Sequence, residues 1–238
     1  MLHNINPKKA SGPVNIQACI LRDCALDLVQ ILAVVFKTSM KEGKVPDDWT
    51  QSNVTAINKK GSRQGPANYR SVSLTSLCCK LLKHVIVSQT MKHLERYTIL
   101  QDCQHDFRAR SCKTQFLALM HELAESLDKR IQTDMIILDF SKAFGRVPHQ
   151  RLFKKAHHYG IRGKKLQRIS SFLNGRTHRV LVQDQSSEEA PVVSGVPHGL
   201  VLGPLLFLIF INDFPVELLA DPNICRHMHH ISPDQVHQ

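Results

Sequence analysis

Apolar residues recur at helical spacing in three long segments of the chain. The first, residues 21–36, ends before Gly43, a residue type that favours the left-handed backbone at the end of a helix. The same spacing runs through residues 78–86 and 116–127, and Ser111 is a candidate N-cap for the last segment. We expect three amphipathic helices whose apolar stripes pack into an ordinary core.

Shorter apolar runs predict strands between and after these helices. Residues 53–57 and 70–74 are strand candidates with a turn at 59–62 between them, and residues 135–138 and 179–182 add two more. Two further helices are expected, at residues 150–158 and after Pro204, where the sequence is apolar on all sides and therefore buried. The pattern indicates an α+β fold with helices packed on a small mixed or antiparallel sheet.

A carboxylate follows the strand candidate at 135–138. Asp139 stands at the end of that run, where a divalent metal could reach it, although an Asp in this place could equally cap the next turn. Downstream, residues 194–204 are rich in Gly and Pro and lead into the apolar residues 205–211. A carboxylate strand followed by such a turn and helix resembles motifs A and B of a polymerase palm.

Five strings narrow the resemblance. They are LDFSKAF, SGVPHGLVLGPLLFLIFIND, NYRSVSLTS, KVPDDW and QHDFRARSC, and their order along the chain is similar to that in reverse transcriptases of non-LTR (LINE-type) retrotransposons. The resemblance covers residues 6–215. It implies a fingers–palm fragment: an N-terminal extension and fingers-like region at 1–132, a palm-like region at 133–222, and a tail at 223–238 that we expect to be disordered.

The family synthesises DNA from deoxynucleotides on an RNA template and a DNA primer, with two Mg²⁺ ions. The resemblance assigns the first metal ligand to Asp139, assisted by the backbone carbonyl of Phe140. The remaining family carboxylates belong to motif C, for which the candidate here is Asp221, in the string Leu-Ala-Asp-Pro. This string is either a shortened remnant of motif C or a chance match in a loop.

The resemblance also implies residues that hold the nucleotide. Lys60 and Arg70 flank the fingers hairpin and would grip the triphosphate. Phe144 falls where an aromatic side chain excludes a 2′-hydroxyl, unless it is an ordinary core phenylalanine, and His198 stands near the nucleotide.

Template contacts are implied in two segments. Gln104 and Arg108 belong to a segment that lies along the template in the family, and Gly195, Pro197 and Gly199 would form a turn whose backbone approaches the template base.

Several positions depart from the family pattern. Where the family usually has Asp, Gln and Gly, this chain has Gly145, His198 and Asp106, and a Trp expected near Arg168 is missing. Pro222 stands where motif C has its second acid. With too few carboxylates for two Mg²⁺ ions, we expect impaired catalysis. The alternatives are a non-catalytic RNA- or DNA-binding module and a retroelement relic without function.

The charge distribution supports a nucleic-acid partner. The 238 residues carry a net charge of +11, and no Asp or Glu occurs between Phe140 and Gln183. A basic stretch of this kind is either a solvated face or a site for phosphates, and we expect the second. The lysines that we expect to bind template are Lys154, Lys155, Lys164 and Lys165.

The cysteines and the N-terminal residues indicate the cellular compartment in which we expect the protein. Seven cysteines without a CxxC pair favour reduced thiols, and the first residues have no long apolar signal segment. We therefore expect an intracellular protein, cytoplasmic or nuclear, that is not in a membrane. The Cys- and His-containing residues 225–237 could hold zinc, but they show no paired ligand spacing, so a disordered tail is the preferred interpretation.

Overall fold

The structure is a computed structural model, and it describes residues 1–59, 61–65, 68–101, 112–133, 140, 143–182, 185–197 and 201–214. Its helices are α1 (Ala18–Asp23), α2 (Ala25–Glu42), α3 (Leu77–Arg96), α4 (Cys112–Asp128), α5 (His149–His158), α6 (Lys164–Leu173) and α7 (Leu202–Ile211). Its strands are β1 (Gln51–Asn58), β2 (Tyr69–Leu74), β3 (Thr177–Val182), β4 (Gln185–Ser186) and β5 (Ala190–Pro191). Short 3₁₀ turns occupy Leu2–Asn4, Asp47–Trp49 and Phe144–Arg146.

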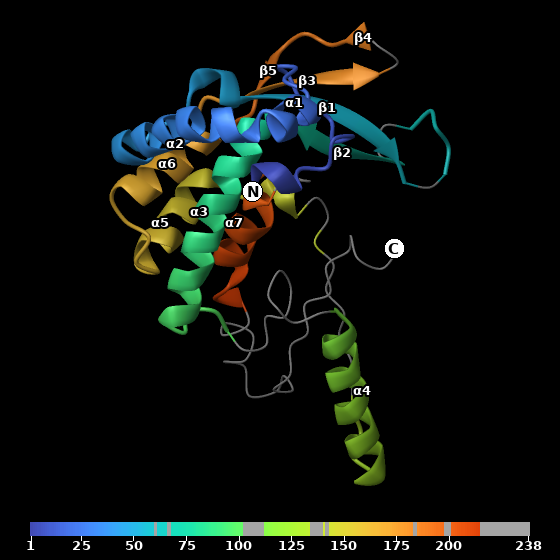
Figure 1. The fold of residues 1–238 in the computed structure, drawn as a ribbon. Helices are drawn as coiled ribbons and strands as arrows, with labels where there is room; N and C mark the ends of the chain where they lie inside the picture. Colours follow the sequence, from blue (N-terminus) through green and yellow to red (C-terminus); the bar gives the residue numbers. More distant parts are fainter. Residues whose placement is uncertain are drawn as a thin grey trace.

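The strands form one mixed sheet in the order β2-β1-β3-β4, and β5 also pairs with β3. β1 and β2 form an antiparallel hairpin in which Ile57 lies opposite Arg70, whereas β1 and β3 are parallel, with Val54 opposite Val180. The sheet lies at the upper right of Figure 1, and α2, α3, α5, α6 and α7 gather beside it. Strands on both sides of the predicted 132/133 boundary therefore share a sheet, and the boundary itself stays a prediction.

The predicted helix ends follow from local backbone geometry. α2 ends at Gly43, whose φ of +72° places it in the left-handed region, and its amide donates to the Ser39 carbonyl oxygen. Gly160, with φ +80°, follows α5 in the same way. The expected α+β class, the β1–β2 hairpin and the buried helix near Pro204 are all confirmed.

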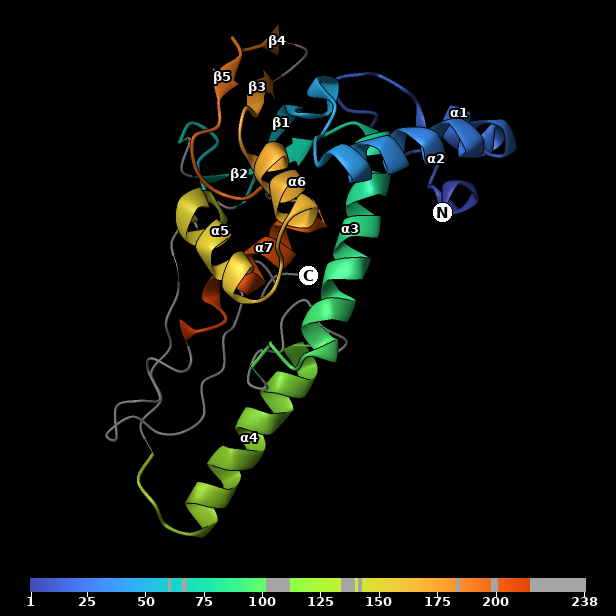
Figure 2. The ribbon, with the colours of Figure 1, turned by 90° about the vertical axis from the view of Figure 1, so that its left-hand side faces the viewer.

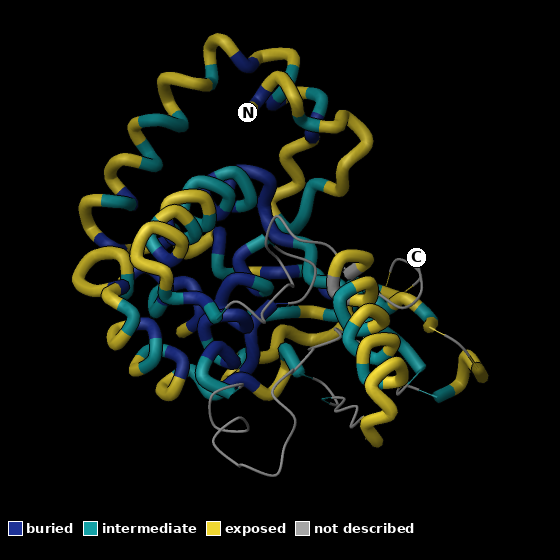
Figure 3. Tube along the Cα trace, turned by 90° about the horizontal axis from the view of Figure 1, so that it is seen from below, coloured by how far each residue is buried: buried dark blue, intermediate teal, exposed yellow. Residues whose placement is uncertain are grey.

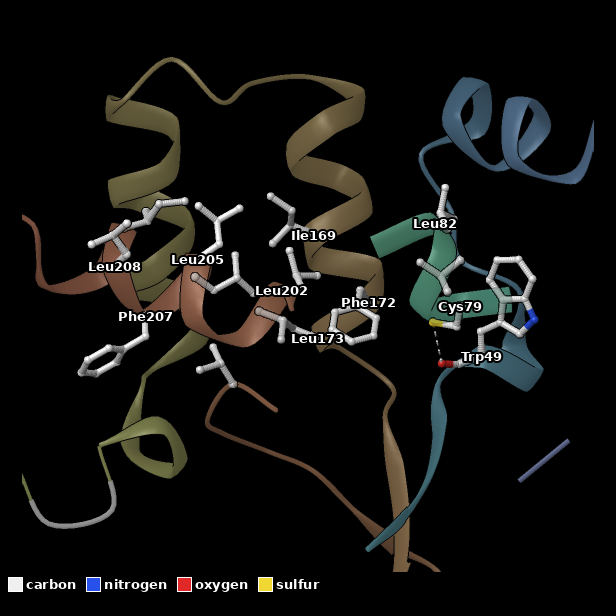
Figure 4. Close-up of a cluster of buried hydrophobic side chains, with 14 of the residues drawn as sticks. Trp49, Cys79, Leu82, Ile169, Phe172, Leu173, Leu202, Leu205, Phe207 and Leu208 are labelled. Atoms are coloured by element: carbon white, nitrogen blue, oxygen red, sulfur yellow. Dashed lines mark hydrogen bonds between the residues drawn. The ribbon is translucent and has the colours of Figure 1, made fainter. Parts of the chain in front are cut away.

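The core lies where α3, α5, α6 and α7 meet (Figure 4). Buried positions gather in the middle of the molecule in Figure 3. Leu206, Leu208 and Ile209 of α7 are fully buried, together with Leu173 of α6. Trp49 packs at the edge of this cluster, and the Cys79 thiol lies 3.7 Å from its carbonyl oxygen (Figure 4). This packing holds α7, and therefore the turn before it, in a fixed place.

The expectation that all three helical stripes pack into the core is wrong for α4. Its Phe116 and Leu127 side chains are 59% and 76% exposed, and α4 extends away from the sheet and the other helices in Figure 1. In Figure 2 only its upper end comes near the end of α3. A helical repeat shows that a helix has an apolar face, but it does not show what covers that face. In the described residues, nothing buries it.

Two smaller findings complete the fold. In the part of the chain that the structure describes, Cys19, Cys24, Cys78 and Cys79 are free thiols. Within the described ranges, every helix is too short or too polar to cross a bilayer.

Candidate functional site

Two turns that are about fifty residues apart in sequence are hydrogen-bonded to each other. The Val196 amide donates to the Phe144 carbonyl oxygen (2.7 Å), and the Gly195 amide donates to the Val147 carbonyl oxygen (3.0 Å). The Phe144 turn begins with the last residue of the motif A string, and Gly195–Pro197 lies at the start of the motif B string. The structure therefore brings the described parts of the two predicted motifs together.

His149 adds a side-chain contact to the same turn. It is the first residue of α5, and its Nε2 lies 2.8 Å from the Gly195 carbonyl oxygen. Sequence reasoning missed this residue, because a histidine at the start of a helix carries no signal that it bonds a turn 46 residues away. The contact holds the Gly195 carbonyl group, while the hydrogen bond to Val147 holds the Gly195 amide.

Glycine is required at Gly195 for two reasons. Its φ of +83° is costly for any residue with a Cβ atom, and an added Cβ would lie 2.8 Å from the Gly145 backbone. Gly203 is equally constrained, since a Cβ there would lie 2.1 Å from the Pro197 carbonyl oxygen. These two glycines let the turn approach both the Phe144 turn and α7.

Of the two glycines that face each other, only Gly195 is crowded. A Cβ added at Gly145 would meet no atom within 4 Å. The absence of the Asp that the family usually has at this position is therefore not imposed by crowding. Nothing in the structure explains why glycine is present there.

Phe144 has a packing role in this structure. Its ring lies 4.8 Å from that of Phe207 on α7, centroid to centroid, and the side chain is half-buried. Phe140, the residue after Asp139, makes an edge contact with Phe214 at 5.3 Å. The core interpretation of Phe144 thus has direct support, while its role toward a nucleotide stays a prediction.

Seven predicted site residues lie outside the described residues. They are Lys60, Gln104, Arg108, Asp139, His198, Gly199 and Asp221. In the part of the chain that is described, no three His, Cys, Asp or Glu side chains come together as a metal site. The two predicted carboxylate ligands stay predictions.

The fingers hairpin is formed as expected, with a longer connection than a tight turn. The Lys59 amide donates to the Asn68 carbonyl oxygen (2.7 Å), and Asn68 Nδ2 donates to the Ser62 carbonyl oxygen (2.8 Å). Arg70 is half-buried on β2, next to this connection. Hydrogen bonds between its own residues stabilise the connection, and its contact with a triphosphate stays a prediction.

The acid-free stretch is not a single exposed face, which corrects the simplest form of that expectation. Arg168 and Arg176 are only 2% and 3% exposed. The Lys155 ammonium group donates to the Phe210 carbonyl oxygen and forms an ion pair with Asp213. Of the four lysines predicted to bind template, Lys154, Lys164 and Lys165 are exposed.

Sequence reasoning also missed a group of buried cations. Lys83 on α3 is 2% exposed, and burial lowers its pKa to about 8; burial likewise lowers the pKa of Arg176 to about 10. The Lys83 ammonium and the Arg176 guanidinium lie 4.0 and 5.2 Å from the centre of the Phe172 ring. The Arg168 Nε and Nη2 atoms have no hydrogen-bond partner within the described residues.

This burial fits the departure noted at Arg168. Burial lowers its pKa, and its Nη1 contacts the Met40 sulfur. An interior position of this kind suits the aromatic residue that the family usually carries there better than it suits a guanidinium.

Comparison with known proteins agrees with this geometry. The family model for reverse transcriptase (RNA-dependent DNA polymerase) matches residues 57–231. A probable RNA-directed DNA polymerase from transposon BS of Drosophila melanogaster is 28% identical over 90% of this chain and 24% of its own length. The polymerase of the mobile element jockey, from the same species, is 27% identical over 88% of this chain and 23% of its own length.

A third Drosophila melanogaster relative, the probable polymerase of transposon X-element, is 28% identical over 87% of this chain. The chain spans about a quarter of the length of these relatives. Because the family model covers most of the chain and the relatives match about nine tenths of it, the chain belongs to the reverse transcriptase (RNA-dependent DNA polymerase) family, in its non-LTR retrotransposon lineage.

Proposed function

We propose that this chain carries the fingers and palm of an RNA-directed DNA polymerase, with an RNA template, a DNA primer and deoxynucleotides as its substrates. The observation that carries the proposal is the hydrogen-bonded pair of turns at Phe144 and Gly195–Pro197. Its partners come from the two strings with the strongest family resemblance, and the family match covers both. Gly195–Pro197 are buried in this structure, and in this proposal the turn that they begin is the part that would approach a template base.

The residues would divide the work as follows. Lys60 and Arg70 would bind phosphate oxygens through charge-assisted hydrogen bonds. Asp139, the Phe140 carbonyl and Asp221 would hold Mg²⁺, which when bound would activate the primer hydroxyl and neutralise the triphosphate. Gly195, Pro197 and Gly199 would face the template base, while His149 keeps the Gly195 peptide oriented.

We further propose that catalysis is impaired in this chain. Asp139 has Asp221 as its only motif C candidate, and Pro222 replaces the second acid. Two metal ions held by too few carboxylates cannot both act on the primer and the leaving group. In primer extension on a homopolymer RNA template at millimolar Mg²⁺, we expect no product above an Asp139→Ala control. Robust extension that disappears in the control would show a working polymerase instead.

A second candidate is a nucleic-acid-binding module without catalysis, and the exposed lysines favour it. Lys164 and Lys165 stand side by side at the start of α6 and are exposed. In fluorescence anisotropy with labelled RNA, we expect the logarithm of the affinity to fall linearly with the logarithm of salt concentration. Reversing both lysines to Glu should reduce this slope by about 1 per lysine.

The matched control is the exposed pair Lys8 and Lys9 near the N-terminus, reversed to Glu in the same way. Both variants lose the same charge, so a general electrostatic effect would change both slopes equally. If the salt dependence of the affinity had the same slope in both variants, Lys164 and Lys165 would not be part of the interface.

A further inference from the structure

Two adjoining hollows lie where the ends of α3, α5 and α7 meet. One, of about 550 Å³, is lined by His93, Tyr97, Ile99, His158, Tyr159, Gly160 and Arg162. The other, of about 470 Å³, is lined by Ile99, Gln101, Lys154, Lys155, His158, Tyr159, Asn212 and Asp213. Because they share Ile99, His158 and Tyr159, they form one continuous surface, called here the α3–α5 hollow.

Four rings line the α3–α5 hollow, those of His93, Tyr97, His158 and Tyr159. Tyr97, the residue at the C-terminal end of α3, is 61% exposed, and its ring lies 4.9 Å from that of His93. The rings of His158 and Tyr159 lie 5.6 Å apart on the neighbouring helix end. An exposed tyrosine ring beside a second ring offers a platform on which another flat, aromatic group can stack.

The charge around these rings is positive. Arg96 holds its guanidinium carbon 5.8 Å from the Tyr97 ring centre, and Lys154 and Arg162 are exposed along the same surface. The carboxylate that lines the hollow, Asp213, is already paired with Lys155. Glu95, exposed beside Arg96 in sequence, is the one acidic residue of α3. Cations around exposed rings are typical of sites that bind phosphates and bases together.

The floor of the α3–α5 hollow is held in place by hydrogen bonds between its elements. His93 Nε2 lies 2.9 Å from the Tyr159 carbonyl oxygen, which joins α3 to α5. Asn212 accepts from the Gln101 amide (3.0 Å) and donates to the Ile99 carbonyl oxygen (2.9 Å), which joins the end of α7 to the chain after α3. A surface held this way loses little conformational freedom when a ligand binds.

The α3–α5 hollow is separate from the Gly195 turn. His149, which contacts Gly195, begins α5, and His158 ends it. A helix of ten residues is about 15 Å long, so the two sites lie at opposite ends of α5. A ligand small enough to fill one site does not reach the other.

We propose that the α3–α5 hollow binds unpaired nucleotides of a single-stranded nucleic acid. A base stacks on Tyr97, and Arg96, Lys154 and Arg162 contact the flanking phosphates. This would give the chain a second nucleic-acid contact, away from the turn that would face the template base, and it does not depend on catalytic competence. An acidic protein segment is the competing ligand class, but it would use the cations without needing the exposed rings.

The test is fluorescence anisotropy of the full chain with a labelled twelve-residue oligothymidylate. We expect Tyr97→Ala to weaken binding about tenfold, in line with the loss of one stacked base, and Tyr97→Phe to retain affinity because it keeps the ring. Arg162→Glu should also weaken binding. A duplex of matched length should be insensitive to Tyr97→Ala, since its bases are already stacked.

Two further measurements keep the proposal falsifiable. Ultraviolet crosslinking of the wild-type chain, followed by peptide mass spectrometry, should place the crosslink in the peptide that contains Tyr97. This readout needs no variant to fold, and a crosslink confined to other peptides would overturn the proposal. Equal affinity of wild type and Tyr97→Ala, or equally effective competition by polyglutamate, would reduce the hollow to a general polyanion surface and would overturn it too.

Discussion

Gly195→Ala should lower the free energy of unfolding by about 3 kcal/mol, which combines the cost of a left-handed backbone with a Cβ and the cost of crowding. The residue has φ +83°, and the new methyl group would lie 2.8 Å from the Gly145 backbone. The Gly195 backbone cannot shift to relieve this clash at low cost, because its amide is hydrogen-bonded to Val147 and its carbonyl oxygen contacts His149. Urea unfolding followed by the fluorescence of the single tryptophan, Trp49, measures the effect.

Gly145→Ala is the matched control, since it adds the same methyl group to the other side of the same contact. A Cβ there meets no atom within 4 Å. We expect a change within about 0.5 kcal/mol, as is usual for a substitution without new crowding. If both variants lost the same stability, the turn would not be packed against Gly145 as the structure shows.

Most elements of the fold could be predicted from the sequence because their signals are local. A helical repeat that stops at a glycine predicts α2 and α5 together with their left-handed ends. Alternating or apolar runs beside a turn predict β1, β2 and β3. The pairing of β1 with β3 joins residues more than a hundred positions apart, and nothing local to either strand specifies that contact.

α6 was not predicted, although its signal is present in the sequence. Its buried residues Ile169, Phe172 and Leu173 keep helical spacing. They stand among lysines and arginines in the acid-free stretch, where the charged residues make the short helical repeat hard to distinguish. β4 and β5 have two residues each and are too short for any periodicity.

The candidate site also contains residues that could be predicted from the sequence and contacts that could not. Gly195 and Pro197 could be found from the motif, because a glycine- and proline-rich turn before an apolar helix is a local pattern. The bonds from Val196 to Phe144 and from His149 to Gly195 could not, because they depend on how α5 and α7 pack together. The burial of Lys83 could not be predicted either, because its segment of α3 is an ordinary mixture of apolar and basic residues.

Lys83→Met should raise the free energy of unfolding by about 2–3 kcal/mol at neutral pH, within the range usual for replacing buried ionic groups with apolar side chains. Burial lowers the pKa of this lysine to about 8, which outweighs the raising effect of the Cys79 thiol. Its ammonium group contacts the Thr75 hydroxyl oxygen at 3.2 Å and shares the Phe172 ring with the Arg176 guanidinium. No carboxylate of the described residues pairs with it. Replacing a buried charge that lacks an acidic partner with an apolar side chain of similar size is often stabilising.

The pH dependence of this gain distinguishes a charge effect from better packing. The unfolded chain holds the lysine proton up to a pKa of about 10.4, whereas the folded chain releases it near 8. Between these values the unfolded state binds more protons, so the stability of the wild type should rise with pH. The cost of burying the charged lysine is fully present below pH 8, and the advantage of Lys83→Met should therefore shrink as the pH rises from 8 to 10.

Urea unfolding at several pH values measures this pH dependence. The control is Lys92→Met, at an exposed position of the same helix, which should show no gain in stability. A gain that is constant across this range would assign the effect to packing, and a loss of stability at pH 7 would show that the buried ammonium group stabilises the fold.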